Sequence, residues 1–322
     1  MVAALLAPGA LFAQTSSTTT PVGYETVNLD AGFNYMGLRL HSTPVISGTF
    51  ETVSGTTLVD TGVDIAATLE VGKTYIVEII DTAGVGAVAE IVKSDVTVDT
   101  ISTVNGFAAL GVTTPASYTI RPAATLASVF GATNSVGLSP GFSGPTDADL
   151  VYVPDGSGGF TQYFYDEDET TWKNAETNTP VDSATVPLVY LDGIIVFANA
   201  TESVVVSGEI KKQPVYQLVK PGFNYLSSVY PASATLASAF NGSLSSINPG
   251  FSGPTDADLI YVPGPTLTQY FYDEDETTWK DAETNTPIDP TTISLPSGII
   301  YFNAGATDST LKNSPPAGYP SL

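Results

Sequence analysis

One stretch of thirteen residues, TQYFYDEDETTWK, occurs twice without change, at Thr161–Lys173 and at Thr268–Lys280. A second repeated block, PGFSGPTDADL, precedes each copy, at Pro140–Leu150 and at Pro249–Leu259. Because both blocks recur in the same order, the sequence predicts that one structural module is used twice. Any fold for this chain has to place the two copies in equivalent surroundings.

The residues in and around these blocks favour strands. Tyr163 and Tyr165 are expected on one face of a strand and Phe164 on the other, because side chains along a strand alternate. The acidic residues that follow, 166–170, are expected to connect a hairpin, and Trp172 begins the return strand. The TLASxF segments at 125–130 and 235–240 have apolar residues at a spacing that predicts one or two helical turns.

The first copy contains an insertion. The stretch GFNY occurs at Gly32–Tyr35 and again at Gly222–Tyr225. In the second copy the TLASxF segment follows soon afterwards, whereas in the first copy it comes only after Pro122. The intervening residues show short strand-like runs separated by turn residues, which favours a small barrel. The predicted fold class is therefore all-β, with two homologous β modules and a small β-barrel inserted into the first.

The predicted organisation follows from these boundaries. It consists of a signal peptide at 1–13, a linker or arm at 14–20, a first β module at 21–41 plus 123–200, an inserted barrel at 42–122, a connecting strand at 201–213, a second β module at 214–304 and an extended tail at 305–322.

Three further segments of the sequence are the PVGY opening at Pro21–Tyr24, a hairpin at Gly48–Leu58 and the join at Tyr118–Ala127. Together they resemble a family of secreted bacterial β-rich proteins of unassigned function. The hairpin with Tyr-x-Tyr, an acidic loop and a Trp is also similar to this family. The resemblance implies secretion and a β-rich fold, and it implies no catalytic residue.

Composition excludes several classes of function. The net charge of −23, from 10 basic and 33 acidic residues, would repel the phosphates of nucleic acids and anionic lipids. The absence of cysteine excludes disulfides and thiol nucleophiles. A zinc site or a Ser-His-Asp triad would depend on His41, the one histidine, which we expect to be an ordinary loop residue after a strand ending near Leu40.

The beginning of the sequence predicts export. Val2–Phe12 is an apolar run, and Ala13 and a Thr/Ser-rich stretch follow it, as in a signal peptide, although no Lys or Arg precedes the run. This run is too short to span a bilayer, and no later stretch is long and apolar enough to do so. The predicted location is extracellular or at the cell surface.

The acidic loops are the candidate metal ligands: Asp166, Glu167, Asp168, Glu169, Asp273, Glu274, Asp275 and Glu276. Consecutive carboxylates repel one another, and Ca²⁺ would relieve this repulsion by taking several oxygen ligands. Asp147, Asp149, Asp256 and Asp258 could add ligands. The alternative is a solvated hairpin tip that prevents strand edges from pairing, and this interpretation is favoured.

The aromatic residues leave two interpretations open. Trp172, Trp279 and the neighbouring tyrosines could form a platform for sugars, but cross-strand pairs over a core are favoured. A glycosidase needs only two suitably spaced carboxylates, yet here the acids lie in the repeated part rather than in irregular sequence. We therefore predict no catalytic residue and no cofactor other than possible calcium.

The predicted function is that of a secreted, non-enzymatic structural or cell-surface protein, self-assembling into an extracellular filament, matrix or envelope layer. The alternative is a calcium- or carbohydrate-binding adhesion module. The predicted partners are copies of the chain, other cell-surface components or a polysaccharide.

Overall fold

The computed structural model describes residues 22–81, 84–107, 110–230, 234–251 and 253–316. The fold is mostly β, as predicted, with 44% strand, 9% helix and many antiparallel sheets. Within these ranges no helix has both the length and the apolar character needed to cross a membrane. The predicted signal peptide and linker lie outside the described residues.

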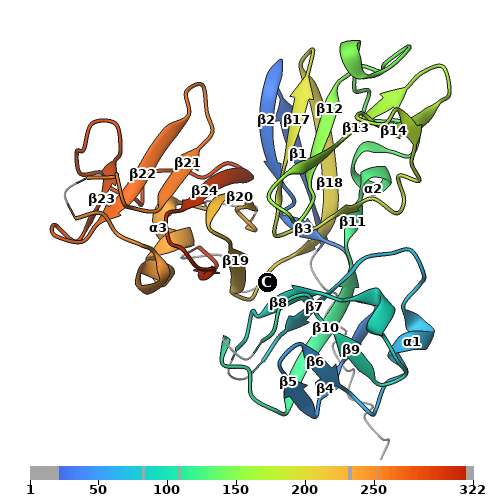
Figure 1. Ribbon diagram of the computed structural model, residues 1–322, viewed down its shortest axis with the longest axis horizontal. Coiled ribbons are helices and arrows are strands. Elements are labelled where there is room, and N and C mark those ends of the chain that lie inside the picture. Colours follow the sequence, from blue (N-terminus) through green and yellow to red (C-terminus); the bar gives the residue numbers. More distant parts are fainter. Residues whose placement is uncertain (1–21, 82–83, 108–109, 231–233, 252, 317–322) are drawn as a thin grey trace, which may run out of the picture.

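Two sheets and a short helix enclose the first hydrophobic core (Figure 1). The larger sheet has the order β15-β14-β13-β12-β17-β2, and the smaller has the order β1-β18-β3. These strands are β1 (Val22–Leu29), β2 (Gly32–Gly37), β3 (Leu40–His41), β12 (Leu150–Pro154), β13 (Phe160–Asp166), β14 (Thr171–Asn174), β15 (Thr179–Pro180), β17 (Gly193–Ala198) and β18 (Glu202–Ile210). A pair of short strands, β11 (Ala124–Thr125) and β16 (Pro187–Leu188), lies beside α2 (Leu126–Phe130).

The local sequence explains where α2 begins. Thr125 accepts a hydrogen bond from the Ser128 amide, and the Ser128 hydroxyl accepts one from the Thr125 amide, which completes a capping box. Leu126, Val129 and Phe130 are then buried in the core. The predicted helical turns at 125–130 and 235–240 are confirmed, because α3 (Leu236–Phe240) has the same capping box.

A second pair of sheets encloses a separate core. The larger sheet has the order β20-β24-β21-β22-β23, and β19 pairs with β25. The bounds are β19 (Val215–Val219), β20 (Gly222–Ser227), β21 (Leu259–Val262), β22 (Thr268–Asp273), β23 (Thr278–Asp281), β24 (Gly298–Asn303) and β25 (Ser309–Asn313), with the 3₁₀ helix η4 (Asn241–Ser246) after α3. The two copies of the thirteen-residue block form the hairpins β13–β14 and β22–β23, with the same register.

The residues between β3 and β11 form two further sheets around a third core. One has the order β4-β10-β7-β8 and the other has the order β5-β6-β9. The elements are β4 (Ile46–Phe50), β5 (Thr52–Ser54), β6 (Thr57–Val59), α1 (Ile65–Thr68), β7 (Tyr75–Ile79), β8 (Val88–Glu90), the 3₁₀ helix η1 (Lys93–Asp95), β9 (Thr100–Ser102) and β10 (Ala116–Pro122).

The closed barrel predicted for 42–122 is not found in the described part of the chain. A bend at Glu51 separates β4 from β5, and β8 ends after three residues, two residues before η1 begins. The isolated bridge between Ile91 and Thr103 links the two sheets. The ladders are too short and too interrupted to form a continuous ring of strand pairs.

The segment predicted as a connecting strand, 201–213, is largely occupied by β18. This strand pairs with β1 along the whole of Val22–Leu29 and also pairs with β3, so it is the central strand of its sheet. The prediction for His41 as a loop residue is wrong, because His41 ends β3 opposite Glu209 and is buried. The pairing with β18, which is distant in sequence, extends the strand beyond Leu40.

The two large sheets approach each other closely where β2 meets β24. A Cβ atom on Gly298 would lie 2.7 Å from the Met36 amide nitrogen, and one on Gly37 would overlap the Ser297 carbonyl. Gln217, on β19, donates from its side-chain amide to the carbonyls of Leu191 (3.0 Å) and Ser227 (3.1 Å). Only glycine permits this approach of one backbone to another.

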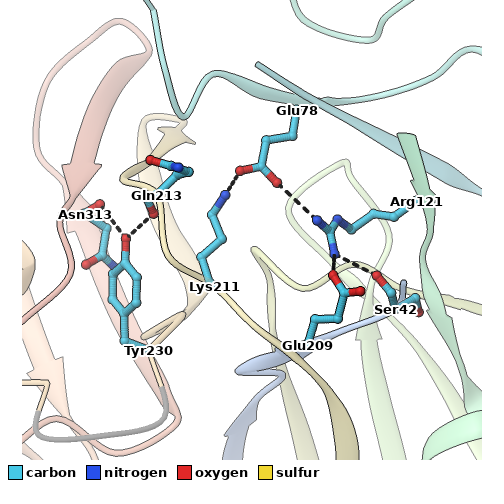
Figure 2. A network of polar contacts seen from close by, with 8 residues as sticks. All are labelled: Ser42, Glu78, Arg121, Glu209, Lys211, Gln213, Tyr230 and Asn313. Atoms are coloured by element: carbon cyan, nitrogen blue, oxygen red, sulfur yellow. Dashed lines mark hydrogen bonds and ion pairs between the residues drawn. The ribbon is translucent and has the colours of Figure 1, made fainter. Parts of the chain in front are cut away.

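A buried network of charged side chains joins the inserted sheets to the first core (Figure 2). Glu78 on β7 contacts Lys211, and it also lies 3.8 Å from Arg121 on β10. Arg121 in turn contacts Glu209 at 3.5 Å and donates to the Ser42 carbonyl at 2.6 Å. Burial lowers the pKa of Lys211 to about 7, but its direct contact with Glu78 favours the charged form. The two carboxylates and two cations then balance in charge, which buried ions require.

The same region continues toward the second pair of sheets. The Tyr230 hydroxyl lies 2.8 Å from the Gln213 carbonyl and 3.1 Å from the Asn313 carbonyl (Figure 2). Gln213 follows Lys211 closely in sequence, and Asn313 ends β25. The residues after β18 therefore contact all three parts of the fold.

His41 lies beside this network as a neutral group. Its ring packs edge-on against Tyr190, with centroids 4.1 Å apart, and within the described residues neither ring nitrogen has a hydrogen-bond partner. Burial, and the nearby charges of Lys211 and Arg121, lower the pKa of His41 well below its ordinary value of 6.5. A proton on His41 would add a third positive charge to a balanced cluster.

This arrangement predicts a loss of stability in acid. Below pH 6.5 the unfolded chain binds a proton at His41, while the folded chain does not until a lower pH, so the free energy of unfolding falls as the pH falls. The loss should approach about 1.4 kcal/mol per pH unit relative to His41→Phe, which keeps a ring against Tyr190. Chemical denaturation of both proteins from pH 7.5 to 5 measures this difference, and parallel pH profiles would contradict it.

Candidate functional site

The acidic loops form hairpin ends that are held internally. Asp166 is buried, accepts a hydrogen bond from the Glu169 amide at 2.8 Å and contacts the Lys173 ammonium at 3.0 Å. Glu169 also contacts Lys173, at 2.6 Å. The Glu169 amide and Lys173 together lower the pKa of the Asp166 carboxyl. The hairpin expected for 166–170 is confirmed, with Thr170 in the left-handed region at φ 50°.

The second acidic loop repeats this geometry. Asp273 contacts Lys280 at 3.0 Å and accepts from the Glu276 amide at 2.9 Å. The remaining side chains of the two loops, Glu167, Asp168, Glu169, Glu274, Asp275 and Glu276, are exposed. No group of three or more acidic or histidine side chains that could hold a metal ion occurs in the described residues.

The second repeated block packs on the first through its backbone. The Gly141 amide donates to the Tyr165 carbonyl at 2.8 Å, and the Glu167 amide donates to the Gly141 carbonyl at 3.0 Å. Gly250 makes the same two bonds with Tyr272 and Glu274, at 2.8 and 3.0 Å. The two repeated blocks of each copy are therefore parts of one local structure.

Of the four other acidic residues considered as ligands, two are buried and two are exposed. Asp149 is buried and accepts from the Ser139 amide at 2.8 Å and from the Asn199 amide at 2.7 Å. Asp258 is also buried and accepts from the amides of Asn248 and Ala304, both at 2.8 Å. Asp147 and Asp256 are exposed. The buried pair ties the loop before β12 or β21 to the end of β17 or β24.

The tryptophans are core residues, as the favoured interpretation predicted. Trp172 is 1% exposed and Trp279 is 2% exposed. Trp172 donates to the Gly131 carbonyl at 2.8 Å, and its ring packs edge-on against Tyr165 with centroids 5.7 Å apart. A sugar platform made from these two tryptophans would therefore be inaccessible.

One group of exposed aromatic residues lies on the opposite face of the large sheet, whereas Tyr24, Phe142 and Phe251 are exposed elsewhere. Phe33 on β2 is 63% exposed and packs between Phe197 on β17, at 5.1 Å, and Tyr152 on β12, at 6.1 Å between centroids. Core residues alternate with them: Met36, Val151 and Val196 point inward. The ring contacts continue from Tyr152 to Phe160 at 6.3 Å.

Phe160 carries this series of rings to the second sheet. Its ring lies edge-on to Tyr225 of β20, with centroids 4.6 Å apart. Phe223, two residues earlier on the same face of β20, is 55% exposed and contacts Tyr261 at 5.8 Å and Phe302 at 4.9 Å. We call this set the aromatic row; it comprises Phe33, Tyr152, Phe160, Phe197, Phe223, Tyr225, Tyr261 and Phe302.

Six of the seven strands that carry the aromatic row contain no charged residue; the seventh, β13, has Phe160 at its start and the buried Asp166 at its end. None of the residues in β2, β12, β17, β20, β21 or β24 is Asp, Glu, Lys or Arg, although the chain has a net charge of −23. Beside the row lies a shallow groove of about 420 Å³, whose lining includes Thr146, Phe160, Gln162 and Glu176. A neutral partner could cover this face without removing ions from water, which is costly.

A second cavity, of about 270 Å³, lies where the three parts of the fold meet. Glu90 of β8 and Asp192, which precedes β17, both line it, with Gln217 and Lys220. Burial and the neighbouring Glu90 raise the pKa of Asp192 to about 7, and burial raises the pKa of Glu90. The Lys220 ammonium donates across the cavity mouth to the Gly156 carbonyl at 2.7 Å.

Sequence reasoning missed the aromatic row and this cavity. The signal for the row was present as paired aromatics in uncharged strands, such as Phe33 and Tyr35, but the strands that adjoin in the sheet are far apart in sequence. Comparison with known proteins adds no further guide, because no family model, curated protein or solved structure matches this chain.

The acidic hairpin yields a matched pair of substitutions. Asp166→Asn should lower the melting temperature by several degrees, because the buried Lys173 then keeps only the exposed Glu169 as a carboxylate partner. Asp168→Asn, in the same loop but exposed, should leave it unchanged. The difference in melting temperature between wild type and Asp166→Asn should shrink as the pH falls through the lowered pKa of Asp166. At that pH the wild-type protein also loses the negative charge of Asp166. Equal melting temperatures for both variants at pH 7 would contradict this assignment.

Proposed function

We propose that the protein is a secreted, non-enzymatic structural or attachment protein of a cell surface or extracellular layer. We further propose that it is built from two homologous β modules, the first of which holds the inserted sheets. The repeated blocks, the common strand order and the equivalent contacts of Gly141 and Gly250 support the duplication. The apolar run at the start of the sequence supports export.

The aromatic row is the observation that carries this proposal. Large apolar side chains that adjoin on the surface of an otherwise acidic chain are typical of an attachment surface. The row recurs in both copies, with Phe33, Tyr152 and Phe197 in the first and Phe223, Tyr261 and Phe302 in the second. A packing role does not account for it, because both central phenylalanines are more than half exposed.

The junction between the modules bears on self-assembly. β2 meets β24 at Gly298, and β17 meets β20 at Gly193, where a Cβ atom would lie 3.0 Å from the Leu226 carbonyl. If the modules are homologous, these two contacts are equivalent, so the interface is self-complementary and closes within one chain. Assembly into a filament or layer would therefore use a surface other than this junction.

Two other candidate functions have specific support. An adhesion module is favoured by the aromatic row, while its predicted calcium sites at 166–169 and 273–276 stay a prediction. Acid–base chemistry is favoured by Glu90 and Asp192, which come from different segments and line one cavity. A glycosidase also uses two carboxyl groups, and burial raises the pKa of both of these.

Location and turnover test the proposal together. Immunogold labelling of the source cells should place the protein outside the cytoplasmic membrane, in a surface or matrix layer. Purified protein should release no reducing ends from polysaccharides. Cytoplasmic labelling would contradict the proposed location, and hydrolysis that disappears in Asp192→Asn would contradict the non-enzymatic role.

A further inference from the structure

We infer that the aromatic row binds an extended, uncharged polysaccharide chain. This inference rests on the proposed function as an attachment protein and specifies its partner. The surface is elongated, because four successive ring contacts run from Phe197 through Phe33, Tyr152 and Phe160 to Tyr225. A row that crosses two sheets suits a long ligand better than a compact one.

Charge favours an uncharged ligand. The net charge of −23 opposes acidic glycans, nucleic acids and anionic lipids, and it opposes a second copy of the chain as well. The face itself is uncharged along β2, β12 and β17 and along β20, β21 and β24. The net negative charge does not repel a neutral polymer, and binding one to this face requires no desolvation of ions.

The side chains of the aromatic row offer both apolar and polar contacts to a sugar. The face of an aromatic ring carries partial negative charge, and it attracts the C–H groups that cover one face of a sugar ring. Polar groups lie among the rings: the Tyr152 and Tyr261 hydroxyls are on the row, and Gln162, Thr146 and Glu176 line the adjoining groove. These groups can donate to or accept from sugar hydroxyls, directly or through water.

Affinity electrophoresis tests this inference in the full-length protein. The gels contain hydroxyethyl cellulose, mixed-linkage β-glucan or galactomannan as neutral probes and alginate as an acidic one. At least one neutral polysaccharide should retard the wild type, and alginate should not. Phe33→Ala combined with Phe223→Ala should weaken the apparent affinity by about tenfold or more, because both exposed central rings are lost.

Tyr24→Ala is the matched control. Tyr24 is an aromatic residue that is 80% exposed, but it lies on β1, in the other sheet of the first core. Its removal should leave retardation unchanged. Equal melting temperatures for the three proteins would show that the double variant is folded, as expected for rings that are mostly exposed.

Three results would overturn the inference. The first is that no neutral polysaccharide retards the wild type. The second is that Tyr24→Ala loses as much binding as the Phe33→Ala, Phe223→Ala double variant. The third is that light scattering shows dimers that Phe33→Ala dissociates, while no polysaccharide binds. A protein located at the surface that gives the first result would leave the proposed function standing. A cytoplasmic location would contradict the proposed function whatever the gels show.

Discussion

The close approach of β2 to β24 is the constraint on which the arrangement of the two large sheets depends. Gly37 and Gly298 leave no room for a side chain between the backbones. This contact brings the start of β13 within reach of β20, so that Phe160 packs against Tyr225. Without it, the exposed rings of the two sheets would be two separate patches rather than one row.

The repeated blocks have a structural explanation that the sequence did not suggest. The backbone of Gly141 pairs with the hairpin that carries the acidic loop, and the buried Asp166 pairs with Lys173 at the same hairpin end. A change in either block disturbs the other, since each supplies hydrogen bonds to its partner. The acidic loops thus have a role in packing, in addition to any that their exposed carboxylates have at the surface.

The features that could be predicted from the sequence are those that local residue patterns determine. The acidic hairpin and the short capped helices depend on neighbours within a few residues, and the burial of Trp172 was expected from the alternation of aromatic residues on a hairpin. The sequence did not predict that β18 pairs with β1, that His41 is buried beside ion pairs, or that Phe33, Tyr152 and Phe197 meet. These contacts join residues far apart in the chain, and one sequence contains no signal for such pairings. The prediction of a closed barrel was wrong because strand-like runs in a sequence do not show whether the strands pair in a closed ring.

The central claim is that the aromatic row continues from one sheet to the other through Phe160 and Tyr225. A double-mutant cycle with Phe160→Ala, Tyr225→Ala and the combined variant measures this contact directly, from the free energies of unfolding. The two rings should show a coupling energy of about 0.5–1.5 kcal/mol, as edge-to-face aromatic pairs do. Additive effects of the two substitutions would contradict the claim.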